Sequence, residues 1–282
     1  MIYLLLSVLS STCIFILFKF FDKYKIDTLQ AIVINYFTAF TCGLILYDGK
    51  IRVEIIYANW FIAAIGLGFL FITIFNIMAL TAQKNGLSVV SVASKMSVII
   101  PILFGIYIYN ESAGFQKIIG IVLALVAVYL TSVKQKDGSS LSKSIYLPII
   151  LFIGSGIIDT SVNHFAPQNH MQLFLAVIFG MAGFIGIVIL SYKSIILKHH
   201  LKLKSIPFGL ALGVVNYCSM YFLLKALRIE GFESSSIFTL NNVSIVAVSS
   251  LIGLFLFKEQ ISKKNWAGIL MAIISIILVT LT

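Results

Sequence analysis

Residues 87–109 read LSVVSVASKMSVIIPILFGIYIY, an apolar run with one charged side chain, Lys95, near its middle. A membrane-spanning helix needs about 20 mostly apolar residues, so this run is long enough to cross a bilayer. A cation at that depth has no water around it, and reported costs range from about 2.5 to above 10 kcal/mol. Such a residue is usually kept for a task, beside a partner or a water-filled cavity. Lys95 is therefore the first candidate functional residue.

The rest of the chain has the same apolar character. Of its 282 residues, 60% are hydrophobic and 11% charged, and the mean hydropathy is +1.06. A soluble domain carries about 25% charged residues. The pattern predicts an all-α membrane protein, embedded in a lipid bilayer, with ten transmembrane helices. The expected spans are 2–20, 28–47, 55–81, 87–109, 116–133, 145–163, 171–192, 206–227, 234–257 and 265–281.

Other classes fit less well. The first run lacks a basic leader and is longer than the apolar part of a signal peptide. Porin-like strands would show short alternating segments in place of continuous apolar runs. The three cysteines, Cys13, Cys42 and Cys218, lie inside spans without metal-ligand spacing. We therefore expect packing roles for them, and neither a metal nor a cofactor.

The formal charge of +10 is interpreted as a sign of topology, and no nucleic-acid partner is expected. Fourteen Lys and Arg residues follow odd-numbered spans and five follow even-numbered ones. By the positive-inside rule, the odd-numbered connections are cytoplasmic and both termini lie outside the inner membrane. The fourteen are Lys19, Lys23, Lys25, Lys84, Lys134, Lys136, Lys143, Lys193, Lys198, Lys202, Lys204, Lys258, Lys263 and Lys264. The five are Lys50, Arg52, Lys117, Lys225 and Arg228.

The chain also repeats itself at an offset of 148 residues. Gly105 then meets Gly253, and Glu111 meets Glu259, a notable match because acidic residues are scarce here. The expected repeats are 1–133 and 145–282, joined by the loop 134–144. Five spans per repeat is an odd number, so the second repeat enters the membrane from the opposite side. Inverted repeats are typical of secondary transporters, which bind substrate near the midplane.

Two stretches carry a family resemblance. The first half contains the segments MALTAQKNGLSVVSVASKMSVIIPILFGIYIYNE and IIGIVLALVAVYL. The corresponding segments of the second half are KALRIEGFESSSIFTLNNVSIVAVSSLIGLFLFKE and WAGILMAIISIILV. They resemble the EamA branch of the drug/metabolite transporter superfamily. The first half has the Pro of that pattern at 101, and the second has Ser249 instead. The resemblance implies a ten-helix transporter, and it implies cytoplasmic termini, opposite to the charge count.

The candidate substrate-binding residues are the polar side chains inside the spans. Asp159, the one acid placed well within a span, is the expected partner of Lys95, either in a structural ion pair or in a cavity. Asn241 and Asn242 are the expected counterparts of Lys95 in the second repeat, and amides suit hydrogen bonding to polar groups. Weaker candidates are Asn163, Asn76, Asn216 and Tyr217.

Other conspicuous residues have structural explanations. Glu111 and Glu259 are expected to cap the next helix, where the dipole favours an acid. The row Gly209 and Gly213 and the row Gly180, Gly183 and Gly186 are expected to allow close helix contact, without indicating dimerisation.

The sequence lacks the residue patterns of the enzyme classes considered. The chain has no HExxH motif, no pair of intramembrane aspartates and no Walker-type loop, and its four histidines lie in loops or at their edges. We therefore predict a secondary transporter that moves a small polar metabolite, such as an amino-acid-like zwitterion, by alternating access. A sugar or nucleoside-type permease using Asn and Tyr hydrogen bonds is the alternative, and an intramembrane enzyme is a weaker one.

Overall fold

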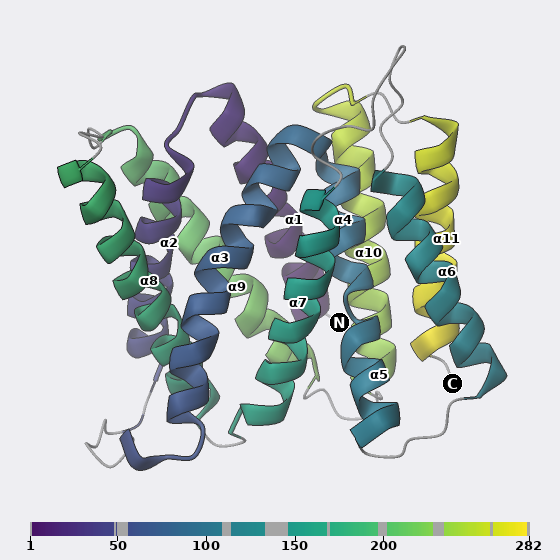
Figure 1. The fold of residues 1–282 in the computed structure, drawn as a ribbon, viewed down its shortest axis with the longest axis horizontal. Coiled ribbons are helices and arrows are strands. Elements are labelled where there is room, and N and C mark those ends of the chain that lie inside the picture. Colours follow the sequence, from purple (N-terminus) through teal and green to yellow (C-terminus); the bar gives the residue numbers. More distant parts are fainter. Residues whose placement is uncertain are drawn as a thin grey trace. The chain divides into compact units, whose positions relative to one another are not determined.

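The computed structural model describes residues 2–47, 49, 56–108, 114–132, 146–167, 170–196, 202–227, 234–259 and 262–280. These residues are helical with short connections and contain no strand, so the all-α prediction is confirmed. The helices are α1 (Ile2–Lys23), α2 (Thr28–Ile45), α3 (Phe61–Asn85), α4 (Leu87–Met96), α5 (Ile99–Ile108), α6 (Phe115–Ser132), α7 (Tyr146–Phe165), α8 (Met171–Ile196), α9 (Ser205–Leu227), α10 (Ser234–Phe255) and α11 (Lys263–Thr280) (Figure 1).

Every expected span contains a helix. Within the described residues, six stretches are long and apolar enough to cross a membrane by length and composition: α1, α2, α3, α8, Leu87–Phe104 and Ser205–Ala226. Shorter apolar stretches lie in α6, α7 and α10. Large apolar side chains such as Ile62, 80% exposed, stand on helix surfaces. Such surfaces are unusual in soluble monomers and suit contact with lipid.

The helices fall into two compact units. Unit 1 comprises Met1–Lys19, Ile77–Ile157 and Cys218–Thr282, and unit 2 comprises Phe20–Asn76 and Ile158–Tyr217. Four helices, α1, α3, α7 and α9, contribute residues to both units. Each unit therefore draws on both expected repeats, 1–133 and 145–282. The inverted relation between those repeats remains a prediction.

In unit 2, glycines bring helices close together. α2 packs beside α8, where Gly180 and Gly183 face the rings of Phe40 and Phe37 (Figure 1). On α9, a Cβ at Gly209 would lie 2.6 Å from Cβ of Ile34 on α2. Alanine does not fit this spacing, so the prediction that both glycine rows allow close helix contact is confirmed.

In unit 1, α6 and α11 lie side by side (Figure 1). A Cβ at Gly268 would lie 3.1 Å from the backbone oxygen of Ala127. Ser275 Oγ donates a 2.7 Å hydrogen bond to the backbone oxygen of Gly120, which joins the same two helices. The apolar core beside them takes in α4, α5, α7 and α10; its buried members are Val92, Met96, Ile99, Ala124, Ala127, Val128, Phe152, Val246, Ile269, Ala272 and Ile276.

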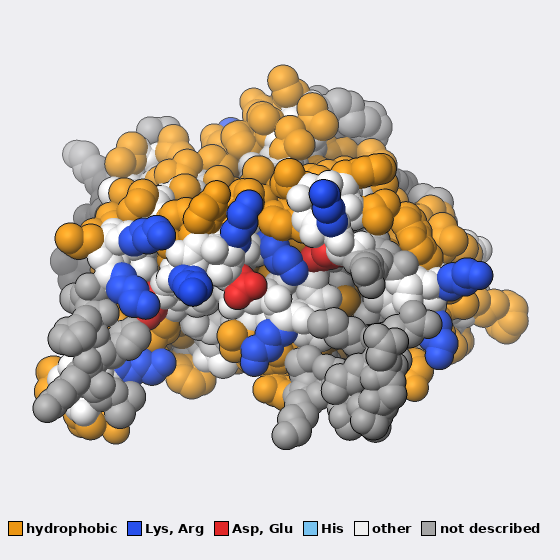
Figure 2. Space-filling model, turned by 90° about the horizontal axis from the view of Figure 1, so that it is seen from above, with side chains coloured by type: hydrophobic (Ala, Val, Ile, Leu, Met, Phe, Trp, Pro, Cys, Tyr) orange, Lys and Arg blue, Asp and Glu red, His pale blue; other side chains and the backbone are white. Residues whose placement is uncertain are grey.

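Within each unit, residues in or near the connections after odd-numbered spans contact one another. In unit 2, Lys204 Nζ donates to the backbone oxygen of Tyr24 at 3.3 Å, and Gln30 Oε1 accepts from the backbone N–H of Lys202 at 2.9 Å. In unit 1, Lys19 pairs with Glu259. Figure 2 looks onto a face where basic side chains stand among hydrophobic and neutral ones, with acidic ones at fewer places. Which side of the membrane is cytoplasmic remains a prediction.

Candidate functional site

The span around Lys95 is interrupted, although the sequence predicted one helix over 87–109. α4 ends at Met96, residues Ser97 and Val98 form a turn, and α5 begins at Ile99. Pro101 explains the break, because proline has no N–H and its ring clashes with the carbonyl four residues earlier, that of Ser97. The Ser97 oxygen instead accepts the N–H of Ile100 at 2.9 Å.

The interruption creates a helix end inside the span. Lys95 lies in the last turn of α4, and its side chain is half-buried. The carboxyl end of a helix carries a partial negative charge, which stabilises a nearby cation. The break after Met96 therefore lowers the cost of placing an ammonium group in an apolar run.

Helix α10 brings two asparagines to the level of this break. α10 packs against α4, and a Cβ at Gly253 would lie 3.3 Å from Cβ of Leu87. Val92 and Met96 share an apolar cluster with Val246, so the two helices run antiparallel. Because both helices rise equally per residue, counting eleven residues on from Leu87 and eleven back from Gly253 sets Val98 about level with Asn242.

The amide of Asn241 has an unsatisfied acceptor. Its side chain is 1% exposed, and its Oδ1 atom has no hydrogen-bond partner among the described residues. Asn242 is 6% exposed. Burying an amide oxygen without a partner is costly, so such an atom in a native protein points to a bound water or ligand. Asn241 is thus a strong binding candidate among the predicted residues.

A row of serines on α4 and at its C-cap was missed by the sequence analysis. Ser88, Ser91, Ser94 and Ser97 recur at every third residue, and all four are buried. Ser91 Oγ donates to the backbone oxygen of Ser88 at 3.1 Å, and Ser88 Oγ has no hydrogen-bond partner in the described part of the chain. The regular spacing was a readable signal of a polar helix face beside Lys95.

The remaining candidates belong to unit 2. Asn216 Nδ2 donates to Asn35 Oδ1 at 3.1 Å, and both side chains are buried. Asn35 was not predicted, although it lies within an expected span. Tyr217 is also buried, and Asn76 Nδ2 donates to the backbone oxygen of Ile72 in its own helix at 2.7 Å.

The predicted set is therefore divided between the units. Lys95, Asn241 and Asn242 lie in unit 1, whereas Asn76, Asp159, Asn163, Asn216 and Tyr217 lie in unit 2. The Asp159 side chain is exposed, and that of Asn163 is outside the described residues. The expected pairing of Lys95 with Asp159 remains a prediction. No group of three His, Cys, Asp or Glu side chains suited to a metal occurs among the described residues.

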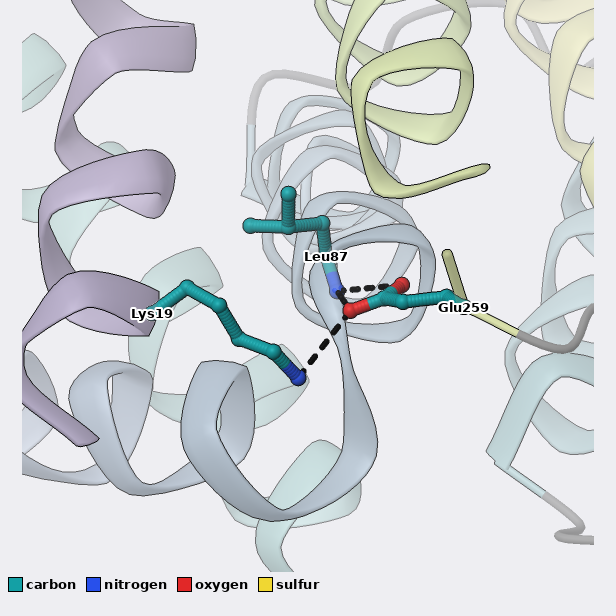
Figure 3. A network of polar contacts seen from close by, with 3 residues as sticks. All are labelled: Lys19, Leu87 and Glu259. Atoms are coloured by element: carbon teal, nitrogen blue, oxygen red, sulfur yellow. Dashed lines mark hydrogen bonds and ion pairs between the residues drawn. The ribbon is translucent and has the colours of Figure 1, made fainter. Parts of the chain in front are cut away.

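Glu259 caps a different helix from the one predicted. Both carboxylate oxygens accept the backbone N–H of Leu87 at 3.0 Å, at the start of α4 (Figure 3). The expected target was α11, the next helix along the chain. That helix is capped instead by Ser262, whose Oγ accepts the N–H of Asn265 at 3.2 Å. Ser262 lies directly before α11, whereas Glu259 lies three residues earlier in the chain, so Ser262 is better placed to cap this helix. Glu111 lies outside the described residues.

The chain is similar in sequence to known proteins. No protein-family model matches the chain. An uncharacterized protein of Haemophilus influenzae is 27% identical over 282 residues, covering 97% of this chain and 95% of its own. The glucose uptake protein GlcU of Staphylococcus xylosus is 30% identical over 182 residues, which span 60% of this chain and 59% of GlcU.

A solved crystal structure covers 99% of this chain and 96% of its own, with a TM-score of 0.59 and 14% identity. At that identity the likeness shows the fold alone. The resemblance to the EamA branch remains a prediction. Together with the apolar helices, these similarities make the chain an integral, multi-pass membrane protein similar in part of its length to a transporter.

Proposed function

We propose that the chain is a sugar-type uptake permease, a secondary carrier for a small neutral solute rich in hydroxyl groups. The observation that carries this proposal is the 30% identity to glucose uptake protein GlcU over 182 residues. This solute class was the alternative in the sequence analysis, which favoured an amino-acid-like solute. The relative now favours the sugar.

The chemistry of unit 1 supports a hydroxyl-rich solute. A sugar hydroxyl both donates and accepts hydrogen bonds, and an asparagine amide offers both roles in return. The Oδ1 atom of Asn241 is a buried acceptor, and the serines of α4 supply hydroxyls near the same break. Lys95 adds an ammonium group that can donate a hydrogen bond to a neutral hydroxyl oxygen of the solute.

A zwitterion such as an amino acid is the second candidate. Lys95 favours it, because a half-buried ammonium beside a helix end suits a carboxylate ligand. The two candidates differ in whether charge or hydroxyl groups determine selectivity.

The transport cycle that we propose is alternating access in the cytoplasmic membrane. The repeats 1–133 and 145–282 are related by inversion in this proposal, as in many secondary transporters. Energy comes from a gradient, because the sequence has no Walker-type loop. We propose no catalytic role and no cofactor.

Exchange in proteoliposomes tests the proposal. Vesicles containing the purified protein and preloaded with unlabelled glucose should take up labelled glucose faster than protein-free vesicles, and unlabelled monosaccharides should compete. Asn241→Ala removes an acceptor and should raise the half-saturation concentration about tenfold, the equivalent of about 1.4 kcal/mol. Gly66→Ala is the control, since a Cβ there meets no atom within 4 Å. Exchange of amino acids with no exchange of sugars would select the second candidate.

A further inference from the structure

The carboxylate of Glu259 joins three segments that are far apart in the sequence. Its oxygens accept the N–H of Leu87, and its Oε1 atom lies 3.1 Å from Nζ of Lys19 (Figure 3). Lys19 belongs to α1, Leu87 begins α4, and Glu259 follows α10. The Lys19 and Glu259 side chains are 21% and 14% exposed, so the contact is shielded but within reach of water. We call this group of three residues the Glu259 clasp.

Two glycines make room for the carboxylate. Gly86 precedes α4 with φ +100°, a conformation that L side chains rarely adopt, and it offers no side chain as a cap. A Cβ at Gly86 would lie 2.8 Å from both carboxylate oxygens, and one at Gly253 would lie 2.7 Å from Oε2. The carboxylate of Glu259 therefore occupies the space that side chains at Gly86 and Gly253 would fill.

The backbone of the connection also holds Glu259 in place. Lys258 adopts φ +50°, and the N–H of Glu259 donates to the backbone oxygen of Gly253 at 3.0 Å. This turn brings Glu259 back alongside the end of α10. A side chain that is 172 residues away in sequence thus reaches Leu87 from a fixed backbone position.

α4 is consequently held at one end and interrupted at the other. It is ten residues long, with the clasp at Leu87 and the break at Ser97 and Val98. Between them it carries the serine row and Lys95. A short helix with a turn at its carboxyl end can change direction there when its amino end is released.

We infer that Glu259 is a positioning residue for solute binding: the clasp fixes α4, and with it Lys95 and the serine row, in the binding arrangement. The inference rests on the proposed function, because it takes unit 1 to bind the solute. Opening the clasp releases the first turn of α4 and weakens solute binding without removing any group that touches the solute.

A cap that serves stability alone has different consequences. It would lower the thermal stability, and transport would fall only in proportion to the amount of folded protein. The half-saturation concentration for the solute would stay the same. The KM, and the exchange of the amides of the first turn, therefore separate the two roles.

The experiment uses the full chain in proteoliposomes. Glu259→Ala removes the carboxylate, and Gly253→Ala displaces it while keeping its charge and raising helix propensity. Gly66→Ala is the matched control on α3. We expect both clasp variants to raise amide hydrogen exchange at residues 87–90 at least tenfold and to raise the KM about fivefold or more, with the maximal rate per folded protein retained. Glu259→Gln keeps an acceptor for the Leu87 N–H, and it should restore part of the binding.

Two results would overturn the inference. One is an unchanged rate of amide hydrogen exchange at residues 87–90 in both clasp variants. The other is faster amide hydrogen exchange at these residues with an unchanged KM for the solute. If the wild-type vesicles exchange no sugar, the proposed function fails on its own. The KM is then measured with the amino acid that the vesicles do exchange. If the vesicles exchange neither sugars nor amino acids, the clasp has no solute to position and serves only as a helix cap. The inference then fails together with the proposed function.

Discussion

The side chains of Asn216 and Asn35 form a buried amide pair, with Nδ2 of the first donating to Oδ1 of the second at 3.1 Å. Asn35 is wholly buried, and its own Nδ2 donates to the backbone oxygen of Ile32 at 3.3 Å. The pair ties α2 to α9 in unit 2. Both side chains are buried, so the hydrogen bond between them is shielded from water.

Removing one member of this pair should destabilise the protein. Asn216→Ala leaves the Oδ1 of Asn35 without its donor, and we expect a loss of about 1–3 kcal/mol in thermal or denaturant unfolding. Replacing both Asn35 and Asn216 by leucine should lower the free energy of unfolding by less than the sum of the two single changes to leucine, because no unpaired amide remains. Asn76→Ala is the control, since that side chain is half-buried and bonds within its own helix. Strict additivity of the two changes would contradict a direct pair.

Gly213→Ala should disrupt the contact between α9 and α2. The added Cβ would meet Cβ of Thr38 and would lie 2.6 Å from the backbone oxygen of Asn35. Overpacking of this kind costs about 1–3 kcal/mol. The apparent melting temperature in detergent should fall for Gly213→Ala and stay near the wild-type value for Gly66→Ala. Equal melting temperatures would mean that the two helices separate easily.

Pro101→Ala should join α4 and α5 into a continuous helix. Alanine supplies the missing N–H and removes the clash with the carbonyl of Ser97. The equivalent place in α10 is occupied by Ser249, and that helix has no break. We expect equal or greater thermal stability with a slower exchange rate. A transport rate equal to that of the wild type would show that the break plays no part in the cycle.

Lys95→Met keeps much of the side-chain length and removes the charge. If Lys95 binds the solute, the variant should fold normally and lose transport. If it only pairs with Asp159, the variant should be unstable, and changing Asp159 to a neutral residue as well should restore folding and activity. Yield, melting temperature and exchange rate distinguish these outcomes. Full transport by Lys95→Met alone would refute a role in binding.

The charge count predicts a cytoplasmic location for the loop 134–144, which is outside the described residues. A single cysteine at Ser139, in a version without Cys13, Cys42 and Cys218, tests this prediction. An impermeant thiol reagent added to intact cells should leave the cysteine unlabelled until the cells are opened. Labelling from outside would instead support the orientation that the EamA resemblance implies.

The sequence predicted the helices well because long apolar runs have few alternatives. The glycine rows were also predictable, since spacing along a helix sets which residues share a face. Even the break between α4 and α5 had a visible cause in Pro101. Leu87–Phe104 is long and apolar enough to cross a membrane, as predicted, but a turn at Ser97 and Val98 divides it. A mid-span proline can either kink a helix or divide it, and neighbouring contacts decide which.

Contacts between distant segments were not predictable from spacing. Glu259 was expected to cap the helix that follows it, whereas it caps α4, 172 residues away. Asn35 was overlooked because a single amide in a span gives no sign of its partner. That the Asn241 oxygen has no partner among the described residues likewise depends on which side chains surround it. These features follow from tertiary packing, and a linear pattern does not record it.

The composition of the two units has a consequence for how the protein is made. α2 packs against α8, and α6 packs against α11, the last helix described. Synthesis begins at the N-terminus, so α2 and α6 enter the membrane long before their partners exist. Neither unit is complete when the ribosome reaches the loop 134–144. The faces of α2 and α6 that pack against α8 and α11 therefore gain these partners only when the second half of the chain has been made.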